Sequence, residues 1–333
     1  MSVPRRFLTL VWGRYRRQSI VTAALLALWC VFVLASPQTF LSDRIYRSFM
    51  STIPVVAVLS MGVTLLVIAG ESDLSFPSLA AAGAYVFAVL YSRNLASAPI
   101  AFAAAIAAGA IMGLLNGFLV VAIGVPSMIT TIGTQFFWRG AILLLCDGLA
   151  VPLASVRNEW LYRLFVGRIG SWEIPAQALW TVLIAAALAV VLNRSRFGDA
   201  VLFSGDNRKT AAMMGIRVDR VRIGVFVIAG ILSAFAGVLS TLELNNWWPT
   251  MGEGYMLLVF ASVFVGGTSA YGGEGTIYGT LIGSIIIGII EAGIISAGLV
   301  GFWTRLVHGL IIIASVSVYA IFARKRRSGG TPE

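Results

Sequence analysis

Polar side chains that could do chemistry gather at one interruption of an otherwise apolar chain, where residues 70–78 read Gly-Glu-Ser-Asp-Leu-Ser-Phe-Pro-Ser. The interruption offers two carboxylates, Glu71 and Asp73, and three hydroxyls. Pro77 suits the first turn of a new helix, and Asp73 or Ser75 could cap that helix. Two interpretations stay open: a helix cap alone, or a broken helix that lines a polar path through a helical bundle. The second interpretation assigns five residues to the path: Asp73, Ser75, Asn116, Thr130 and Thr268.

Residue patterns for metal, nucleotide or hydrolytic chemistry are not found in the sequence. The one histidine is His308, and Cys30 and Cys146 lie in apolar stretches, so we expect neither a metal site nor a disulfide framework. The glycine-rich stretch 265–280 contains neither phosphate-binding pattern, because Tyr278 stands where the dinucleotide pattern needs glycine. We therefore expect no catalytic residue, no metal and no cofactor in this chain.

Several ionisable groups fall inside apolar stretches, where they are expensive to bury. Arg139, Glu243 and Arg305 lie near the ends of these stretches, where their side chains could snorkel to the interface. Glu291 and His308 lie deeper, and a proton relay built from them is an alternative role.

The composition is that of a polytopic membrane protein. Of the 333 residues, 59% are hydrophobic and 11% charged, and the mean hydropathy is +0.91. A soluble domain carries about a quarter charged residues, so an ordinary cytosolic enzyme, a disulfide-stapled secreted domain and a disordered regulator are excluded. The net charge of +10 comes from residues between the apolar stretches. We attribute it to membrane orientation and expect no nucleic-acid partner.

At roughly 20 residues per crossing, the sequence predicts an all-α fold with about ten transmembrane helices and broken or re-entrant segments. The predicted spans lie near residues 19–36, 51–70, 77–92, 98–122, 127–146, 176–193, 222–243, 255–270, 276–298 and 302–323. We expect the first span to stay uncleaved, with a signal peptide as the alternative.

Basic residues set the expected orientation. An even number of spans places both chain ends and the long basic loop 194–221 on one side, which the positive-inside rule identifies as the cytoplasm. We expect a basic cytoplasmic N-terminus over 1–18, a transmembrane domain over 19–323 and a basic cytoplasmic tail over 324–333.

Glycines spaced by four occur in the fourth and ninth predicted spans. Each set is expected to lie on one helix face, where two backbones can approach closely. Because the spans are five apart, a true repeat would be inverted across the membrane, and coincidence in a glycine-rich chain is the alternative. The helix-packing residues are Gly109, Gly113, Gly117, Gly275, Gly279 and Gly283.

The long basic loop contains a possible short helix. Gly205, Asp206 and Asn207 indicate a turn and an N-cap, and residues 210–214 indicate an amphipathic helix closed by Gly215. Such a helix between two spans suits either an interfacial element or a docking site for a partner, and the residues alone leave both open.

Four runs in order resemble the membrane subunit of ATP-binding-cassette importers for simple sugars, the ribose, xylose and galactose permease family. The family's Gly-Gly-Ile-Asp-Leu-Ser-Val-Gly-Ser is similar to residues 70–78, and its Val-Pro-Ser-Phe-Ile-x-Thr-Leu-Gly to residues 125–133, followed here by Arg139 and Gly140. Its Gly-x-Asn-x-x-Ala-Ala-x-x-x-Gly-Ile pattern is similar to residues 205–216, and its late glycine motif to residues 266–280. The likeness covers about 45–322.

The chain departs from the family at the first run. Glu71 replaces a usual glycine, and Phe76 and Pro77 replace Val-Gly. Both departures fall where the family shapes its pathway, so we do not carry over ribose as the substrate.

The resemblance implies the permease subunit of a bacterial importer for a simple sugar or related polyol, in the inner membrane. The implied partners are a second copy of the chain, a cytoplasmic ATPase that holds ATP and Mg, a periplasmic or lipid-anchored sugar-binding protein, and membrane lipid. The implied ATPase-coupling helix contains Gly205, Asp206, Asn207, Ala211, Ala212 and Gly215.

Three rival functions are also considered. The same machinery could carry nucleosides or furanosyl signalling molecules. An ion-coupled secondary transporter would depend on Glu291, His308 or Asp73. A membrane-embedded enzyme would need clustered nucleophiles, bases or metal ligands, and the sequence shows no such cluster.

Overall fold

The computed structural model describes residues 3–296, 298 and 302–328, and nearly all of its regular elements are helices. The long helices are α1 (Val3–Ala35), α3 (Asp43–Ile68), α4 (Phe76–Ser92), α5 (Ala98–Phe118), α6 (Ser127–Cys146), α8 (Ala176–Arg194), α11 (Val218–Leu244), α12 (Tyr255–Val265), α13 (Ile277–Ser296) and α14 (Phe302–Ser328). Shorter helices are α2 (Pro37–Phe40), the π-helix η1 (Leu119–Ile123), the 3₁₀ helix η2 (Ala154–Asn158), α7 (Trp160–Val166), α9 (Arg196–Asp206) and α10 (Arg208–Met213).

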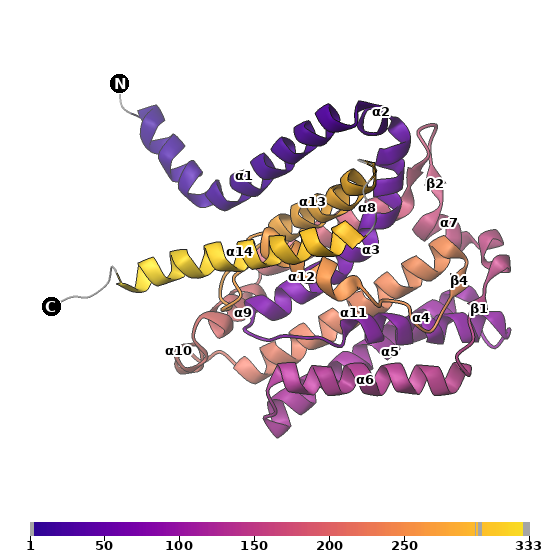
Figure 1. The fold of residues 1–333 in the computed structure, drawn as a ribbon. Helices are drawn as coiled ribbons and strands as arrows, with labels where there is room; N and C mark the ends of the chain where they lie inside the picture. The colour runs from indigo at the N-terminus through magenta and orange to yellow at the C-terminus, as the bar shows by residue number, and fades with distance from the viewer. Residues whose placement is uncertain (1–2, 297, 299–301, 329–333) are drawn as a thin grey trace.

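Four two-residue strands form two small antiparallel pairs. Strand β1 (Val151–Pro152) pairs with β4 (Asn246–Trp247), and β2 (Arg168–Ile169) pairs with β3 (Ile174–Pro175). Both pairs lie with α7 at one end of the bundle, whereas α9 and α10 lie at the other end (Figure 1). These are called the strand end and the α9–α10 end below.

The all-α polytopic class predicted from composition is confirmed. In the described part of the chain, seven helices are long and apolar enough to cross a membrane. This set comprises the Gln18–Ala35 part of α1, then α3, α5 with η1, α6, α8, α11 and α13. Among the described residues, the apolar helical stretches in α4, in α12 and over Phe302–Ala314 of α14 are shorter. Each expected span therefore contains a helix.

Some predicted boundaries were wrong. Helix α3 begins at Asp43 rather than 51, because Ser42 caps it and its first turns are polar, so hydropathy alone does not detect them. Helix α12 ends at Val265 rather than 270, where the glycine-rich stretch begins. Most of the loop 194–221 is helical, as α9 and α10 and the start of α11.

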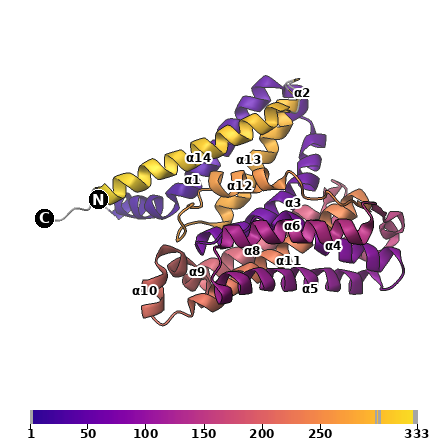
Figure 2. The same ribbon diagram turned by 60° about the horizontal axis from the view of Figure 1, so that its bottom comes forward.

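Helix α11 is at the centre of the bundle, packed against α3, α4 and α5 (Figures 1 and 2). Its contact with α5 is close because the facing residues are small. A Cβ atom at Gly109 would lie 2.5 Å from the Gly230 carbonyl oxygen, and one at Gly113 would collide with the Phe226 carbonyl. Gly117 lies against Ile223 one turn further along. The two backbones therefore meet along the face that these three glycines of α5 form.

The second glycine set is divided between a helix and a loop. Gly279 and Gly283 lie on α13 and face the carbonyls of Gly266 and Ser262 at the end of α12. Gly275 precedes α13 and lies against the Ile68 side chain, so its expected place on the helix face was wrong. The reason is that α13 begins only at Ile277.

A second, smaller apolar cluster joins the outermost helices. Helices α1 and α14 both pack against α13, and the end of α14 lies at the α9–α10 end (Figures 1 and 2). The buried members of this cluster are Val21 of α1 and Ile286, Ile290 and Ile294 of α13.

Candidate functional site

The chain between α3 and α4 is a buried break in the helical bundle. Helix α3 closes with Gly70, whose φ of +76° suits glycine. Its N–H donates to the Val67 carbonyl over 3.0 Å, and the Glu71 N–H donates to the Leu66 carbonyl over 2.9 Å. This is the Schellman arrangement, which satisfies the last carbonyls of a helix. Residues 71–75 then lead to α4 without forming a helix or strand.

Three predicted path residues come together in this break. Asp73 Oδ1 accepts hydrogen bonds from the N–H and the Oγ of Ser75, each over 2.6 Å. Asn116 of α5 donates from Nδ2 to Ser75 Oγ over 2.7 Å. All three side chains are fully buried. Asp73 thus holds the entry to α4, in which Pro77 occupies the first turn as the sequence suggested.

The other two predicted path residues lie apart from this chain of hydrogen bonds. Thr130 is in the first turn of α6, and Thr268 is in the glycine-rich stretch after α12. Both are buried, and neither hydroxyl has a hydrogen-bond partner among the described residues. Asp73 Oδ2 is likewise buried without a partner there. Buried polar atoms of this kind can bond to water or to a passing polar solute.

Helix α6 supplies a polar stripe to the break that sequence reasoning missed. The Ser72 N–H donates to Ser127 Oγ over 3.2 Å, and the Leu74 N–H donates to Thr131 Oγ1 over 3.0 Å. One turn further, the Ser78 N–H donates to Gln135 Oε1 over 3.1 Å. The stripe residues are spaced by four, so they share a helix face. This spacing in an apolar span was the signal, because backbone donors inside a bundle need such partners.

The loop between α8 and α11 contains a two-helix element. Asn207 caps α10, accepting from the Thr210 N–H over 3.1 Å, as the sequence suggested. Gly215 follows α10 with a φ of +82°. The turn expected at Gly205 and Asp206 is wrong, because these two residues are the last residues of α9. A Cβ at Gly205 would collide with the Ile68 carbonyl at the end of α3, so glycine permits close contact there. Of the α10 residues, Ala211 is buried and Ala212 and Met213 are exposed.

The two-helix element contacts the break directly. The Gly273 N–H donates to the Ile68 carbonyl over 2.8 Å, which joins the glycine-rich stretch to the end of α3. Glu71 Oε1 accepts from Arg208 of α10 over 2.6 Å and from Arg222 of α11 over 2.5 Å. Arg208 also donates to the Gly70 carbonyl over 3.0 Å. The α9–α10 end of the bundle is therefore bonded to the same segment that holds Asp73 and Ser75.

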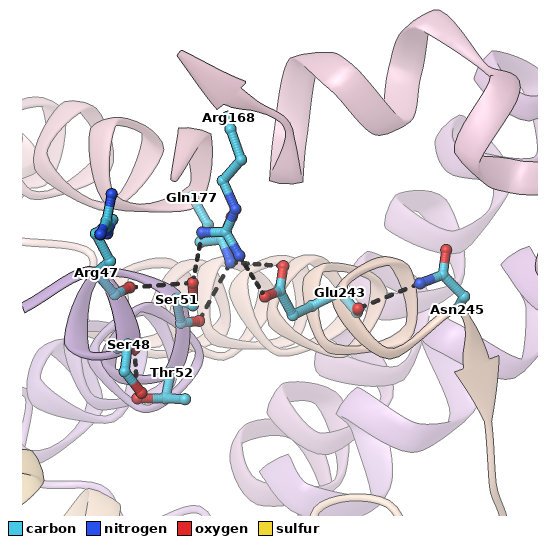
Figure 3. Close-up of polar contacts among 8 residues, drawn as sticks. All are labelled: Arg47, Ser48, Ser51, Thr52, Arg168, Gln177, Glu243 and Asn245. Carbon is cyan, nitrogen blue, oxygen red and sulfur yellow. Dashed lines mark hydrogen bonds and ion pairs between the residues drawn. The ribbon is translucent and has the colours of Figure 1, made fainter. Parts of the chain in front are cut away.

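A second polar cluster lies at the strand end (Figure 3). Arg168 of β2 donates to Ser51 Oγ over 2.7 Å and pairs with Glu243 of α11 over 3.3 Å. Gln177 of α8 donates to the Ser51 carbonyl over 3.3 Å and to Glu243 over 2.9 Å. Glu243 lies in the last turn of α11, near a span end as expected, and its carboxylate is paired there. The cluster fastens the β2–β3 hairpin to α3, α8 and α11, and no spacing in the sequence indicates it.

The remaining intramembrane ionisable groups lie on α6, α13 and α14, and Glu291 and His308 are near enough to interact electrostatically. Arg139 of α6 donates to the carbonyls of Pro249 and Met251, which anchors the loop after β4. Glu291 lies exposed on α13, and His308 is buried on α14. Among the described residues, no three His, Cys, Asp or Glu side chains gather as metal ligands.

A family model and individual relatives both identify the chain as similar to permease components of transport systems. Residues 45–316 match the model of the family described as branched-chain amino acid transport system / permease component. The chain is 31% identical over 315 residues to the ribose import permease protein RbsC of Escherichia coli K12, covering 94% of this chain and 96% of the relative. It is 32% identical to the RbsC protein of Bacillus subtilis 168, covering 84% and 85% of the two chains.

A relative with another cargo in its name also matches. The autoinducer 2 import system permease protein LsrC of Salmonella choleraesuis SC-B67 is 27% identical, covering 87% of this chain and 82% of the relative. No solved structure matches. The matched region includes the break, the α9–α10 element and the glycine-rich stretch. The relatives of the chain include sugar-import permeases, the class that the motifs of the sequence indicate. The chain therefore belongs to this family of transport-system permease components.

Proposed function

We propose that the chain translocates a simple sugar or related polyol across the bacterial inner membrane, as the permease subunit of an ATP-binding-cassette importer. ATP and Mg would be held by a separate cytoplasmic ATPase, and cargo would arrive on a periplasmic or lipid-anchored binding protein. The names of the relatives, ribose and autoinducer 2 import permeases, support this cargo class. The buried hydroxyls and amide around the break suit a neutral, hydroxyl-rich solute.

One observation carries the proposal: the α9–α10 element is bonded to the buried break through Glu71 and Arg208, over 2.6 Å. In an importer, the surface that binds the ATPase must be physically connected to the segment that borders the path. The exposed tip of α10, with Met213 87% exposed, offers a surface to the ATPase. The break offers the polar groups that border the path. ATP binding would move α10 and so favour one access state over the other.

The membrane arrangement follows from the same proposal. With ten spans, which include α4, α12 and α14, both termini and the α9–α10 end face the cytoplasm, which their basic residues favour. The strand end then faces the binding protein. We propose an inverted repeat that relates the fourth and ninth spans, α5 and α13. Both carry glycines on the face that packs against a neighbouring helix.

We also propose that two copies of the chain form the transport path. Exposed apolar side chains on α6, such as Phe136 and Leu144, leave this helix open to lipid or to a second copy. Cross-linking of the purified complex, followed by mass measurement, would count the copies.

Co-purification tests the proposed function. The chain would be expressed with its neighbouring genes and purified in nanodiscs. We expect an ATPase to remain bound, and its activity to rise when a binding protein loaded with ribose or with autoinducer 2 is added. Ribose and autoinducer 2 are tested in separate experiments, and a nucleoside is tested in a third. A chain that purifies alone and takes up solute under an ion gradient would overturn the proposal in favour of a secondary transporter.

A further inference from the structure

Glu71 is a charged residue in a place where charges are expensive. Only 2% of its side chain is exposed. Its Oε1 accepts from both Arg208 and Arg222, over 2.6 and 2.5 Å. A buried ion pair stabilises a fold little compared with apolar packing, because desolvation offsets the attraction. Breaking such a pair is nevertheless costly, since it leaves an uncompensated charge. The arrangement is therefore better suited to making two segments move together than to adding stability.

The three charges come from three different elements. Glu71 lies in the break, two residues before Asp73. Arg208 is the first residue of α10, and Arg222 is in the second turn of α11. Among the ion pairs of the described residues, these two connect the 69–75 segment with the α10 region. A shift of α10 would change both contacts and act on the segment that holds Asp73.

The arginines also face the surface where a partner would dock. The Arg208 side chain is 47% exposed, and the Arg222 side chain is 14% exposed. Both line a groove of about 570 Å³. The other charged residues that line it are Lys209, Arg217, Asp219 and Arg220. Arg208 is thus both exposed at the surface and paired with a buried carboxylate. A partner that displaces the Arg208 side chain would therefore change its ion pair with Glu71.

Other contacts already hold the α9 helix against α3. The Gly205 backbone of α9 packs on the Ile68 carbonyl, and Gly273, whose N–H bonds to the same carbonyl, packs against Asp206 of α9. These backbone contacts do not need the Glu71 carboxylate. The ion pair therefore has a role separate from holding the two segments together.

We propose that Glu71 is a positioning residue that transmits movement of α10 to the 69–75 segment through Arg208 and Arg222. This inference rests on the proposed function, because it takes the movement of α10 from ATPase docking. Glu71 does not contact the cargo in this scheme. It makes the break follow α10.

Two introduced thiols test docking and transmission separately. Cys30 and Cys146 would first be replaced by serine. Met213→Cys then reports ATPase contact at the tip of α10, and Ser72→Cys reports the state of the break. The assembled importer in nanodiscs is treated with N-ethylmaleimide, with and without Mg and a non-hydrolysable ATP analogue. Each thiol is tested with Glu71 intact, with Glu71→Gln, and with Asp43→Asn. The last is a matched control outside the groove, because it removes an exposed carboxylate that pairs with Arg47 over 2.6 Å.

We expect the ATPase to protect the thiol at position 213 in all three backgrounds. The nucleotide should change the labelling rate at position 72 about fivefold or more with Glu71 intact and with Asp43→Asn. In Glu71→Gln this change should be lost. Arg208→Gln, a change at a half-exposed side chain, should reduce the change in the same direction.

Each other outcome overturns a stated claim. A nucleotide response at position 72 that persists in Glu71→Gln would overturn the inference and leave the proposed function intact. Loss of protection at position 213 in Glu71→Gln would also overturn it, because Glu71 would then only hold α10 in place. No protection at position 213 with Glu71 intact would overturn the proposed function itself, and the inference with it.

Discussion

Asn116 donates a hydrogen bond to Ser75 Oγ over 2.7 Å, and both side chains are fully buried. The bond joins the last turn of α5 to the break, because Asn116 lies near the end of α5 and Ser75 stands at the entry to α4. The Ser75 hydroxyl in turn donates a hydrogen bond to Asp73 Oδ1. One amide thus orients a hydroxyl that in turn satisfies a buried carboxylate.

Replacing that amide should weaken both the fold and transport. In Asn116→Leu the Ser75 hydroxyl loses its donor, and a buried group left unsatisfied costs about 1–3 kcal/mol. We expect a lower thermal unfolding midpoint for the permease in detergent and reduced uptake by the assembled importer. Asn193→Leu is the control, because Asn193 is exposed and bonds only to the Ala189 carbonyl of its own helix. Equal midpoints for the two variants would contradict the role given to Asn116.

Asp73 should matter for transport more than for assembly. Asp73→Leu removes the acceptor of both Ser75 bonds, whereas Asp73→Asn keeps one oxygen in place. We expect uptake to fall strongly in Asp73→Leu and less in Asp73→Asn, with the ATPase bound normally in both. Uptake of radiolabelled cargo into proteoliposomes, divided by the amount of bound ATPase, measures this. Full uptake by Asp73→Leu would show that the carboxylate has no part in the path.

The close approach of α5 and α11 makes a prediction about glycine. In Gly113→Ala the new methyl group would collide with the Phe226 carbonyl, so the two helices must separate. Overpacking of this kind costs about 1–3 kcal/mol, which should appear as a lower unfolding midpoint in nanodiscs. Gly133→Ala is the matched control, since nothing lies within 4 Å of a Cβ there. An unchanged midpoint for Gly113→Ala would mean that the contact is looser than described.

The sequence was informative wherever the signal is local. Apolar runs of membrane length predict the helices, and the Asn207 cap and the Pro77 first turn follow from residue type at a single position. The start of α3 was missed because its first turns are polar, and hydropathy registers only the apolar part of a helix.

Contacts between distant residues could not be read from spacing. Glu71 and Arg208 are 137 residues apart in sequence, and no periodicity relates them. Gly205 looked like a turn because glycine favours turns, but its lack of a side chain serves a contact with the end of α3. The cluster of Arg168, Ser51 and Glu243 likewise depends on three elements that meet only in the fold.

Gly215 sets the end of α10 and gives the last prediction. Its φ of +82° is in the left-handed region, where a residue with a Cβ is strained whatever space surrounds it. Space is available, since nothing lies within 4 Å of a Cβ there. Backbone conformation rather than collision therefore decides the outcome. In Gly215→Trp we expect the last turn of α10 to change, so that ATPase docking, substrate-stimulated ATP hydrolysis and uptake all fall.

A graded series separates backbone strain from bulk at Gly215. Asparagine tolerates the left-handed region better than other residues with a Cβ, so Gly215→Asn should keep more coupled activity than Gly215→Ala, although alanine is smaller. Stimulated ATP hydrolysis by the purified importer would rank the three variants. If alanine is tolerated as well as asparagine, or if Gly215→Trp hydrolyses ATP and takes up cargo normally, the left-handed turn after α10 is not needed for coupling to the ATPase.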